Sequence, residues 1–130
     1  MLIGYTRIAK VQSAEDLNIQ KNVLIEFGCQ DQNIYTEETA REEDRSELLL
    51  AVNALRKGDK LVVPRLSSLS YDLTEISRTL EKIEYKSANL VILDLGGTVL
   101  DTSTKVGASM LKALQAAATL GGEELRERKL

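Results

Sequence analysis

The chain has 130 residues, 43% of them hydrophobic and 28% charged, which are the proportions of one soluble globular domain with a single core. Its net charge of -3 and pI near 5.1 argue against a free-standing nucleic-acid-binding protein, since such proteins are usually basic. Histidine is absent and Cys29 is the single cysteine, so the sequence predicts no metal, no cofactor and no internal disulfide. No apolar run is long enough for a membrane span, and the N-terminus lacks a signal-peptide pattern. We therefore expect a cytoplasmic protein.

The N-terminal part of the chain alternates signals for strands and helices. The apolar run at residues 2–8 predicts a first strand. Ser13 is placed to cap a helix whose apolar pattern continues until Gly28 ends it. Residues 33–36 predict a weak second strand. The acidic run at residues 37–43 predicts a solvated loop, with a cation site as the rarer alternative, because the run does not follow the pattern of a calcium loop.

The central stretch of the chain has the pattern of a strand, a polar turn and a helix. The apolar run at residues 61–63 predicts a strand buried on both faces, and Pro64, which has no amide donor, suits its end. A serine-rich turn follows at residues 67–70. Helix signals flank this stretch at residues 44–57 and 73–83. An α/β sheet usually places its site at such a turn, but this one carries hydroxyl groups and neither a carboxylate nor a histidine.

The C-terminal part predicts one strand and one long helix. Residues 90–93 predict the strand, which the glycine pair at residues 96–97 ends. A helical pattern then runs from residue 103 to residue 130, roughly 40 Å at 1.5 Å per residue, which is longer than a small domain needs. Its apolar stripe contains Val106, Met110, Leu114 and Ala117. We expect this stripe to pack against another subunit, the alternative being a helix folded back on its own sheet. A bend or an end is expected at residues 121–122, since each glycine costs about 1 kcal/mol in a helix.

Strands that alternate with helices predict an α/β fold, with a mostly parallel sheet flanked by helices and a long C-terminal helix. We expect residues 1–102 to form the α/β core and residues 103–130 to form a dimerisation helix within the same domain.

Several motifs occur in a fixed order along nearly the whole chain. They are GYTRI at residues 4–8, Asp44-Arg45, GDKLVV at residues 58–63, Leu66 with Leu69, and LDTST at residues 100–104 with Gly107. Together they resemble the catalytic domain of the serine site-specific recombinases, the resolvase/invertase family. In that family the matching segments are the opening strand, a loop arginine, the central strand, the LDRLGR turn and the entry to the dimerisation helix. The resemblance implies the family's fold, and a homodimer or a mixed dimer with an active recombinase.

The departures from the family's pattern fall on its chemistry. In the family a serine directly after the first strand attacks a DNA phosphodiester, and arginines stabilise the charge on the phosphorus. At the nucleophile position this chain has Ala9, whose methyl group cannot attack. Ser67, Ser68 and Tyr71 replace the acidic and basic residues of the LDRLGR turn. The resemblance therefore implies a degenerate active site.

Two arginines match the family, so part of its anion site is expected to persist. They are Arg7 and Arg45. The segment after the first strand is about two residues longer than in the family, which leaves Ser13 as either a displaced nucleophile or, more commonly, a helix cap. We expect no helix-turn-helix DNA-binding domain like the family's after the long helix, and we therefore expect DNA binding to be weak or to occur only through a partner.

Other groups have rival interpretations. Residues 92–102 are similar to the DxDGT motif of haloacid-dehalogenase-type phosphatases, with Asp94 as nucleophile, but Gly96 replaces the second aspartate. The ordinary interpretation is a strand that ends in a glycine turn, with Asp101 capping the last helix. Tyr5 is expected to pack against the sheet, and Cys29 to be a buried or incidental thiol.

Two functions remain open. The first is a non-catalytic relative of the serine recombinases, which keeps the fold and the dimer helix and acts through protein–protein contact. The second is a recombinase that still cleaves DNA with a hydroxyl from Ser13, Ser67 or Ser68. The missing nucleophile, the lost arginines and the acidic pI favour the first.

Overall fold

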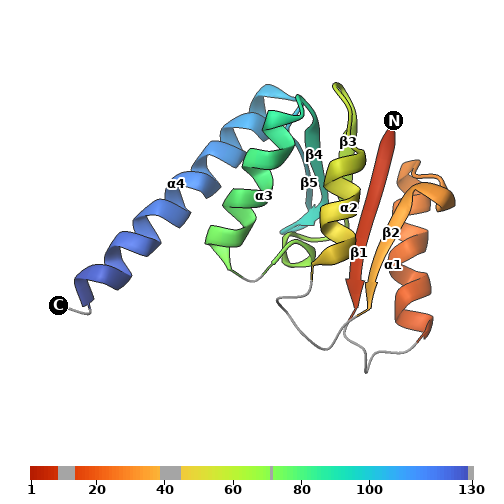
Figure 1. Cartoon of the computed structure of the whole chain (residues 1–130), viewed down its shortest axis with the longest axis horizontal. Helices are drawn as coiled ribbons and strands as arrows, with labels where there is room; N and C mark the ends of the chain where they lie inside the picture. The colour runs from red at the N-terminus through yellow and green to blue at the C-terminus, as the bar shows by residue number, and fades with distance from the viewer. Residues whose placement is uncertain (9–13, 39–44, 71, 129–130) are drawn as a thin grey trace.

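The computed structural model of the protein describes residues 1–8, 14–38, 45–70 and 72–128, and the side chains in these ranges except those of residues 14 and 118–128. The described part of the chain contains one five-stranded sheet in the order β2-β1-β3-β4-β5 (Figure 1). The strands are β1 (Leu2–Ile8), β2 (Ile34–Glu38), β3 (Lys60–Val63), β4 (Asn89–Leu95) and β5 (Thr98–Asp101). The helices are α1 (Ala14–Phe27), α2 (Ser46–Ala54), α3 (Leu73–Tyr85) and α4 (Lys105–Arg128), with short 3-10 turns η1 (Asp31–Asn33) and η2 (Leu66–Ser68). The predicted α/β fold, mostly parallel with a long C-terminal helix, is confirmed.

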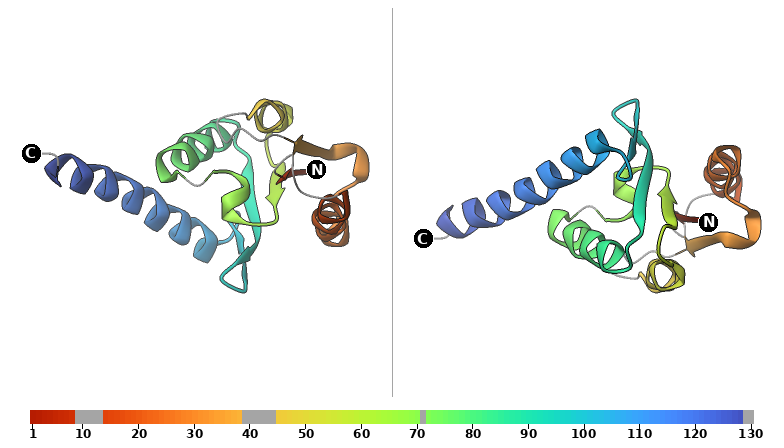
Figure 2. Two further views of the ribbon diagram at one scale, coloured as in Figure 1. Left: turned by 90° about the horizontal axis from the view of Figure 1, so that it is seen from below. Right: turned by 90° about the horizontal axis from the view of Figure 1, so that it is seen from above.

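The sheet separates two apolar layers. α2 and α3 lie on one face of it and α1 lies on the other (Figure 2). Successive strand residues point to opposite faces, so the residues of β3 divide between the layers. Leu61 and Val63 join the larger core under α2 and α3, whereas Val62 packs in a smaller cluster with Leu24 of α1. Leu61, Val62 and Val63 are all fully buried, which confirms the prediction of a strand covered on both faces.

A fifth strand, not predicted from the sequence, follows the glycine pair. β4 continues to Leu95, and β5 returns antiparallel to it from Thr98. Gly96 and Gly97 have φ values of 63° and 87°, the conformation of a two-residue hairpin turn that glycine adopts without strain. The Gly97 amide donates to Asp94 Oδ1 at 2.8 Å. The glycine pair therefore ends one strand, as predicted, and also starts the next.

The ends of the first two helices follow from single residues. Gly28 has a φ of 128°, and its amide donates to the carbonyls of Leu24 and Ile25, so it ends α1 as predicted. α2 ends at Ala54 and not at residue 57, because Leu55 adopts extended backbone and buries its side chain in the core, where it is 2% exposed.

The junction between β5 and α4 is a polar network around Asp101. Lys60 Nζ donates to Asp101 Oδ2 at 2.8 Å, and the amide and hydroxyl of Ser103 donate to Oδ1 at 2.9 and 2.7 Å. Burial acts to raise the pKa of Asp101, but the hydrogen bonds from Lys60 and Ser103 outweigh it and lower that pKa. The helix cap is Thr104, whose hydroxyl accepts from the Gly107 amide at 3.0 Å. The predicted cap at Asp101 is wrong, because Asp101 forms the turn that precedes the cap.

α4 leaves the body of the domain and extends away from it (Figures 1 and 2). It continues through Gly121 and Gly122 to Arg128, so an end at the glycine pair, one of the two predicted alternatives, is wrong. The alanine, leucine, glutamate and arginine residues around the pair are good helix formers, and they propagate the helix across two unfavourable positions. None of the described helices, α4 included, has the length and apolar content that crossing a membrane requires.

Candidate functional site

A cavity of about 760 Å³, the strand-end cavity, lies where β1, β3 and β4 reach their carboxyl ends beside α1. This is the place where an α/β sheet usually binds its ligand. Three of the predicted site residues line it together: Arg7 in β1, and Ser67 and Ser68 in η2. The serine-rich turn after β3 therefore occupies the position that its sequence pattern predicted.

The strand-end cavity carries balanced charge. Arg7 and Arg65 supply two cations, and Asp16 and Asp94 supply two carboxylates. Asp94 is exposed and holds the β4–β5 turn through its bond from Gly97. An anion that enters this cavity would be attracted by the arginines and repelled by the aspartates.

α1 forms one wall of the strand-end cavity. Ile19 and Val23 line it, and their side chains are 58% and 39% exposed. The hydroxyl of Thr6, which is fully buried in β1, donates to Gln20 Oε1. This bond fixes α1 along the strand that carries Arg7.

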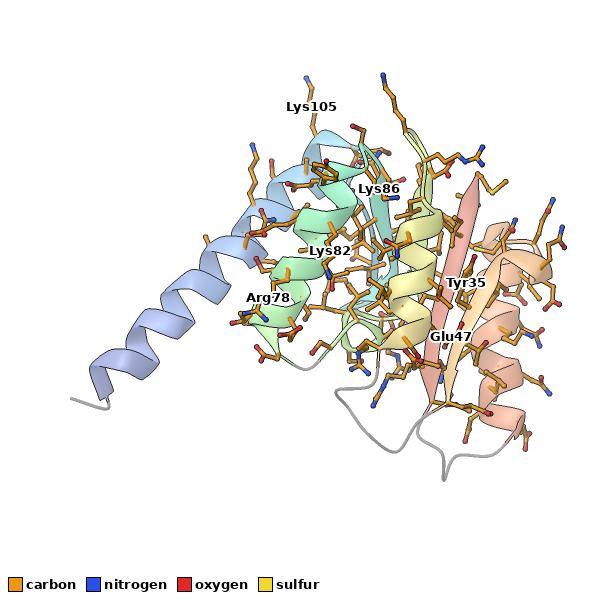
Figure 3. All side chains as sticks on the ribbon, viewed as in Figure 1. Tyr35, Glu47, Arg78, Lys82, Lys86 and Lys105 are labelled. Atoms are coloured by element: carbon orange, nitrogen blue, oxygen red, sulfur yellow. The ribbon has the colours of Figure 1, made fainter. Side chains whose placement is uncertain are left out.

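Arg45, the second predicted arginine, lines a different hollow, the α2–α3 groove of about 680 Å³. Arg45 Nε donates to the carbonyl of Leu69 at 3.0 Å, which ties the start of α2 to the residue after η2. A second bond joins the two helices, since Lys86 Nζ, just after α3, donates to the carbonyl of Asn53 in α2 at 3.0 Å. Figure 3 shows Lys82 on the side of α3 that faces α2. The two arginines of the predicted anion site therefore line separate hollows.

A buried polar pair, Tyr5 and Glu37, joins β1, β2 and α2. The Tyr5 hydroxyl donates to Glu37 Oε1 at 3.3 Å, and both residues are buried, at 0% and 4% exposed. Glu37 also accepts from the Glu47 amide, 3.2 Å from each oxygen, and from the Ser46 hydroxyl at 3.4 Å. Burial and the charge of Glu37 raise the pKa of Tyr5 far above its usual value, although the charges of Arg45 and Arg7 act in the opposite direction.

The prediction of a solvated loop from residue 37 is wrong for its first two residues. β2 continues through Glu37 to Glu38, and Glu37 is buried because Tyr5 and the first turn of α2 satisfy its carboxylate. The predicted packing of Tyr5 against the sheet is confirmed, since Tyr5 belongs to the larger core.

Arg65, Gln20 and Glu37 were not predicted as site residues. The usual sequence signal for a buried charged residue is its position within an apolar run. Glu37 stands in an acidic run instead, so it carries no such signal.

Three of the predicted site residues, Ala9, Ser13 and Tyr71, lie outside the described residues.

The predicted stripe on α4 is largely open to solvent. Val106 is 71% and Met110 is 36% exposed, Ala117 is exposed and Leu114 is half-buried.

Cys29 is buried, and burial raises the pKa of its thiol to about 11, so it is the buried thiol that was predicted. Among the described residues, no group of three or more Cys, Asp or Glu side chains is arranged to hold a metal ion.

Residues 2–130 match the family model described as "Resolvase, N terminal domain". A resolvase of Clostridium perfringens is 29% identical over 105 residues, which cover 80% of this chain and 53% of that protein. The serine recombinase gin of Escherichia phage Mu is 29% identical over 131 residues, covering 100% of this chain and 64% of the relative. The chain thus spans about half to two thirds of the length of these relatives.

Solved structures share the fold. The N-terminal catalytic domain of TP901-1 integrase superposes with a TM-score of 0.73 at 18% identity, covering 94% of this chain and 96% of that one. A resolvase family site-specific recombinase from Streptococcus pneumoniae gives a TM-score of 0.70 at 18% identity, covering 98% and 91%. The family match over residues 2–130 leaves the dehalogenase-type interpretation of Asp94 without support.

Proposed function

Because the chain belongs to the resolvase N-terminal domain family, the catalytic-domain family of the serine recombinases, we propose that it is a recombinase-type domain that no longer cuts DNA. The observation that carries this proposal is the alanine at residue 9, the position that the sequence resemblance assigns to the family's serine nucleophile. A strand-cleaving transesterification needs a nucleophile that forms a covalent bond to phosphorus, and a methyl group cannot supply one.

The turn after β3 supports the same proposal. Ser67 and Ser68 line the strand-end cavity at the positions where the family carries an acid and an arginine. A phosphoryl transition state gains most of its stabilisation from fixed positive charge. In this cavity two aspartates oppose the two arginines, which lowers the net positive charge available to stabilise such a transition state. Arg7 and Arg45 are proposed to keep only a capacity to attract anions, each in its own hollow.

The second candidate function, a recombinase with a displaced serine, is favoured by one observation. Ser67 and Ser68 lie in the same cavity as Arg7, so a hydroxyl and a cation are both near the place where a phosphate would bind. Ser13 would be a further candidate nucleophile.

A covalent-adduct experiment separates the two candidates. The protein is incubated with supercoiled plasmid and with a pool of random duplexes, denatured in detergent, treated with nuclease and weighed by mass spectrometry. We expect no serine to carry a nucleotide. A nucleotide adduct on the wild type, lost in Ser67→Ala, Ser68→Ala or Ser13→Ala, would establish the displaced-serine function.

The domain is proposed to act as a dimer, either with a second copy or with an active recombinase, and to reach DNA weakly or only through that partner. α4 supports the proposal because it turns Gly107 and Leu111 inward, both buried, and leaves Val106 and Met110 exposed beside them. The buried free thiol of Cys29 fits a reducing compartment such as the cytoplasm.

Met110→Arg tests the dimer. The new charge lies in the middle of the exposed stripe, and burying it in a dimer would require desolvation without a partner. In sedimentation velocity we expect the wild type to be a dimer and Met110→Arg a monomer. Lys112→Glu, an exposed change on another side of α4, is the control and should stay dimeric. A wild type that is monomeric at every concentration would refute the dimer.

A further inference from the structure

We infer that Glu37 is a positioning residue that holds Arg45 in place by capping α2 from the neighbouring strand. The inference rests on the proposed function only in taking Arg45 as a remnant of the anion site. It assigns a role to a buried carboxylate that touches neither hollow.

α2 begins without a capping side chain of its own. The residue at the N-cap position of α2 is Arg45, whose side chain makes no capping hydrogen bond. Arginine is a poor N-cap, because it has no acceptor for the free amides of the first turn and its charge opposes the helix dipole. α2 therefore needs its acceptor from elsewhere in the fold.

Glu37 supplies that acceptor. Both of its oxygens lie 3.2 Å from the Glu47 amide, and Oε2 lies 3.4 Å from the Ser46 hydroxyl. Figure 3 labels Glu47 in the first turn of α2. A carboxylate at this point also complements the positive end of the helix dipole and offsets the arginine charge. Because capping is done by a residue of β2, the N-cap position is available for an arginine.

The carboxylate is itself held in one place. Tyr5, fully buried in β1, donates its hydroxyl to Glu37 Oε1 at 3.3 Å. On the far side, Arg45 Nε donates to the Leu69 carbonyl at 3.0 Å. A continuous chain of contacts thus runs from β1 through Glu37 and the first turn of α2 to Arg45, and from there to the segment that carries Ser67 and Ser68.

The side chain of Arg45 provides the test, because its Nε–H is observable by NMR in ¹⁵N-labelled protein. We expect hydrogen exchange at Arg45 Nε to be slower than at the exposed Arg56. Glu37→Gln, which keeps the shape and removes the charge, should speed exchange at Arg45 Nε roughly 2- to 30-fold, the range that corresponds to losing a helix cap. Glu38→Gln makes the same charge change on the exposed neighbouring residue and should leave exchange unchanged.

A merely structural role would give a different result. If Glu37 positions Arg45, the faster hydrogen exchange in Glu37→Gln is confined to Arg45 and the first turn of α2. The backbone amides of β3 and β4 then stay protected from exchange. Equal loss of protection at all of these amides, or no change at Arg45 in Glu37→Gln, overturns the inference. Should Glu37→Gln unfold, Tyr5→Phe decides the matter: a smaller rise in exchange at Arg45 supports the inference, and no rise overturns it. None of these readouts depends on whether the protein cleaves DNA.

Discussion

Gly107→Ala is expected to lower the free energy of unfolding by about 1–3 kcal/mol or more, the cost of forcing an extra carbon into a closed contact. A Cβ at this position would lie 1.8 Å from the Asp101 carbonyl oxygen and 2.5 Å from its carbon. Both atoms belong to the backbone, so no side-chain rotation relieves the overlap.

The contact cannot relax at low cost, because Asp101 is fixed. Its carbonyl accepts from the Thr104 hydroxyl at 2.7 Å and from the Thr104 amide at 3.1 Å. Moving α4 outward instead would withdraw Leu111, which is 7% exposed, from the larger core. The close approach of α4 to the end of β5 is the physical reason for glycine in this motif.

Urea unfolding followed by circular dichroism measures the effect of Gly107→Ala. Ser109→Ala, an exposed change in the same helix, is the control and should stay within about 0.5 kcal/mol of the wild type. Equal midpoints for Gly107→Ala and wild type would show that α4 does not approach the Asp101 backbone closely enough to exclude a Cβ at residue 107.

Glu37→Leu is expected to cost about 2–4 kcal/mol of unfolding free energy, since it leaves the buried Tyr5 hydroxyl and the partly buried Glu47 amide without this acceptor and removes a favourable helix-dipole interaction. Leucine fills a similar volume, so the loss is polar and not a cavity effect. The structural basis is that all of these groups meet at one carboxylate.

Glu38→Leu is the matched control for Glu37→Leu. It removes the same charge one residue further along β2, where the side chain is exposed, and is expected to change stability by less than about 0.5 kcal/mol. The two variants are compared by urea unfolding at neutral pH. Similar stability losses in both would mean that net charge, and not the buried network, accounts for the effect.

Most of the fold was predictable because its strands and helices carry local patterns. Residues 61–63 are apolar throughout because β3 is central and buried on both faces. α3 spaces Ile76, Leu80 and Ile83 on one face, and all three are buried as that spacing predicts. Signals of this kind need no knowledge of distant parts of the chain.

β5 was missed for a different reason. Thr98 and Val99 are exposed, so the edge strand shows little of the burial pattern that marks the others. The glycine pair between two apolar runs is a hairpin signal in itself, and applying it to residues 96–97 would have found the strand.

The buried role of Glu37 could not be predicted, because it depends on partners 32 and 10 positions away in the sequence. Glu37 and Glu38 look alike in sequence, and only the fold separates the buried one from the exposed one. The division of Arg7 and Arg45 between two hollows likewise depends on how α2 lies on the sheet. The strand-end cavity was predictable, because it follows from strand topology alone.

The most direct test of the proposed loss of cleavage is a crystal structure with bound sulfate, read at the carboxyl ends of the strands. Sulfate stands in for the phosphate of a DNA backbone, and the quantity to measure is the distance from each nearby serine Oγ to the sulfur. We predict that arginine nitrogens contact the anion and that no serine Oγ approaches the sulfur within about 3–3.5 Å, the near-attack distance. A hydroxyl of Ser13, Ser67 or Ser68 aimed at the sulfur within that distance would contradict the proposal.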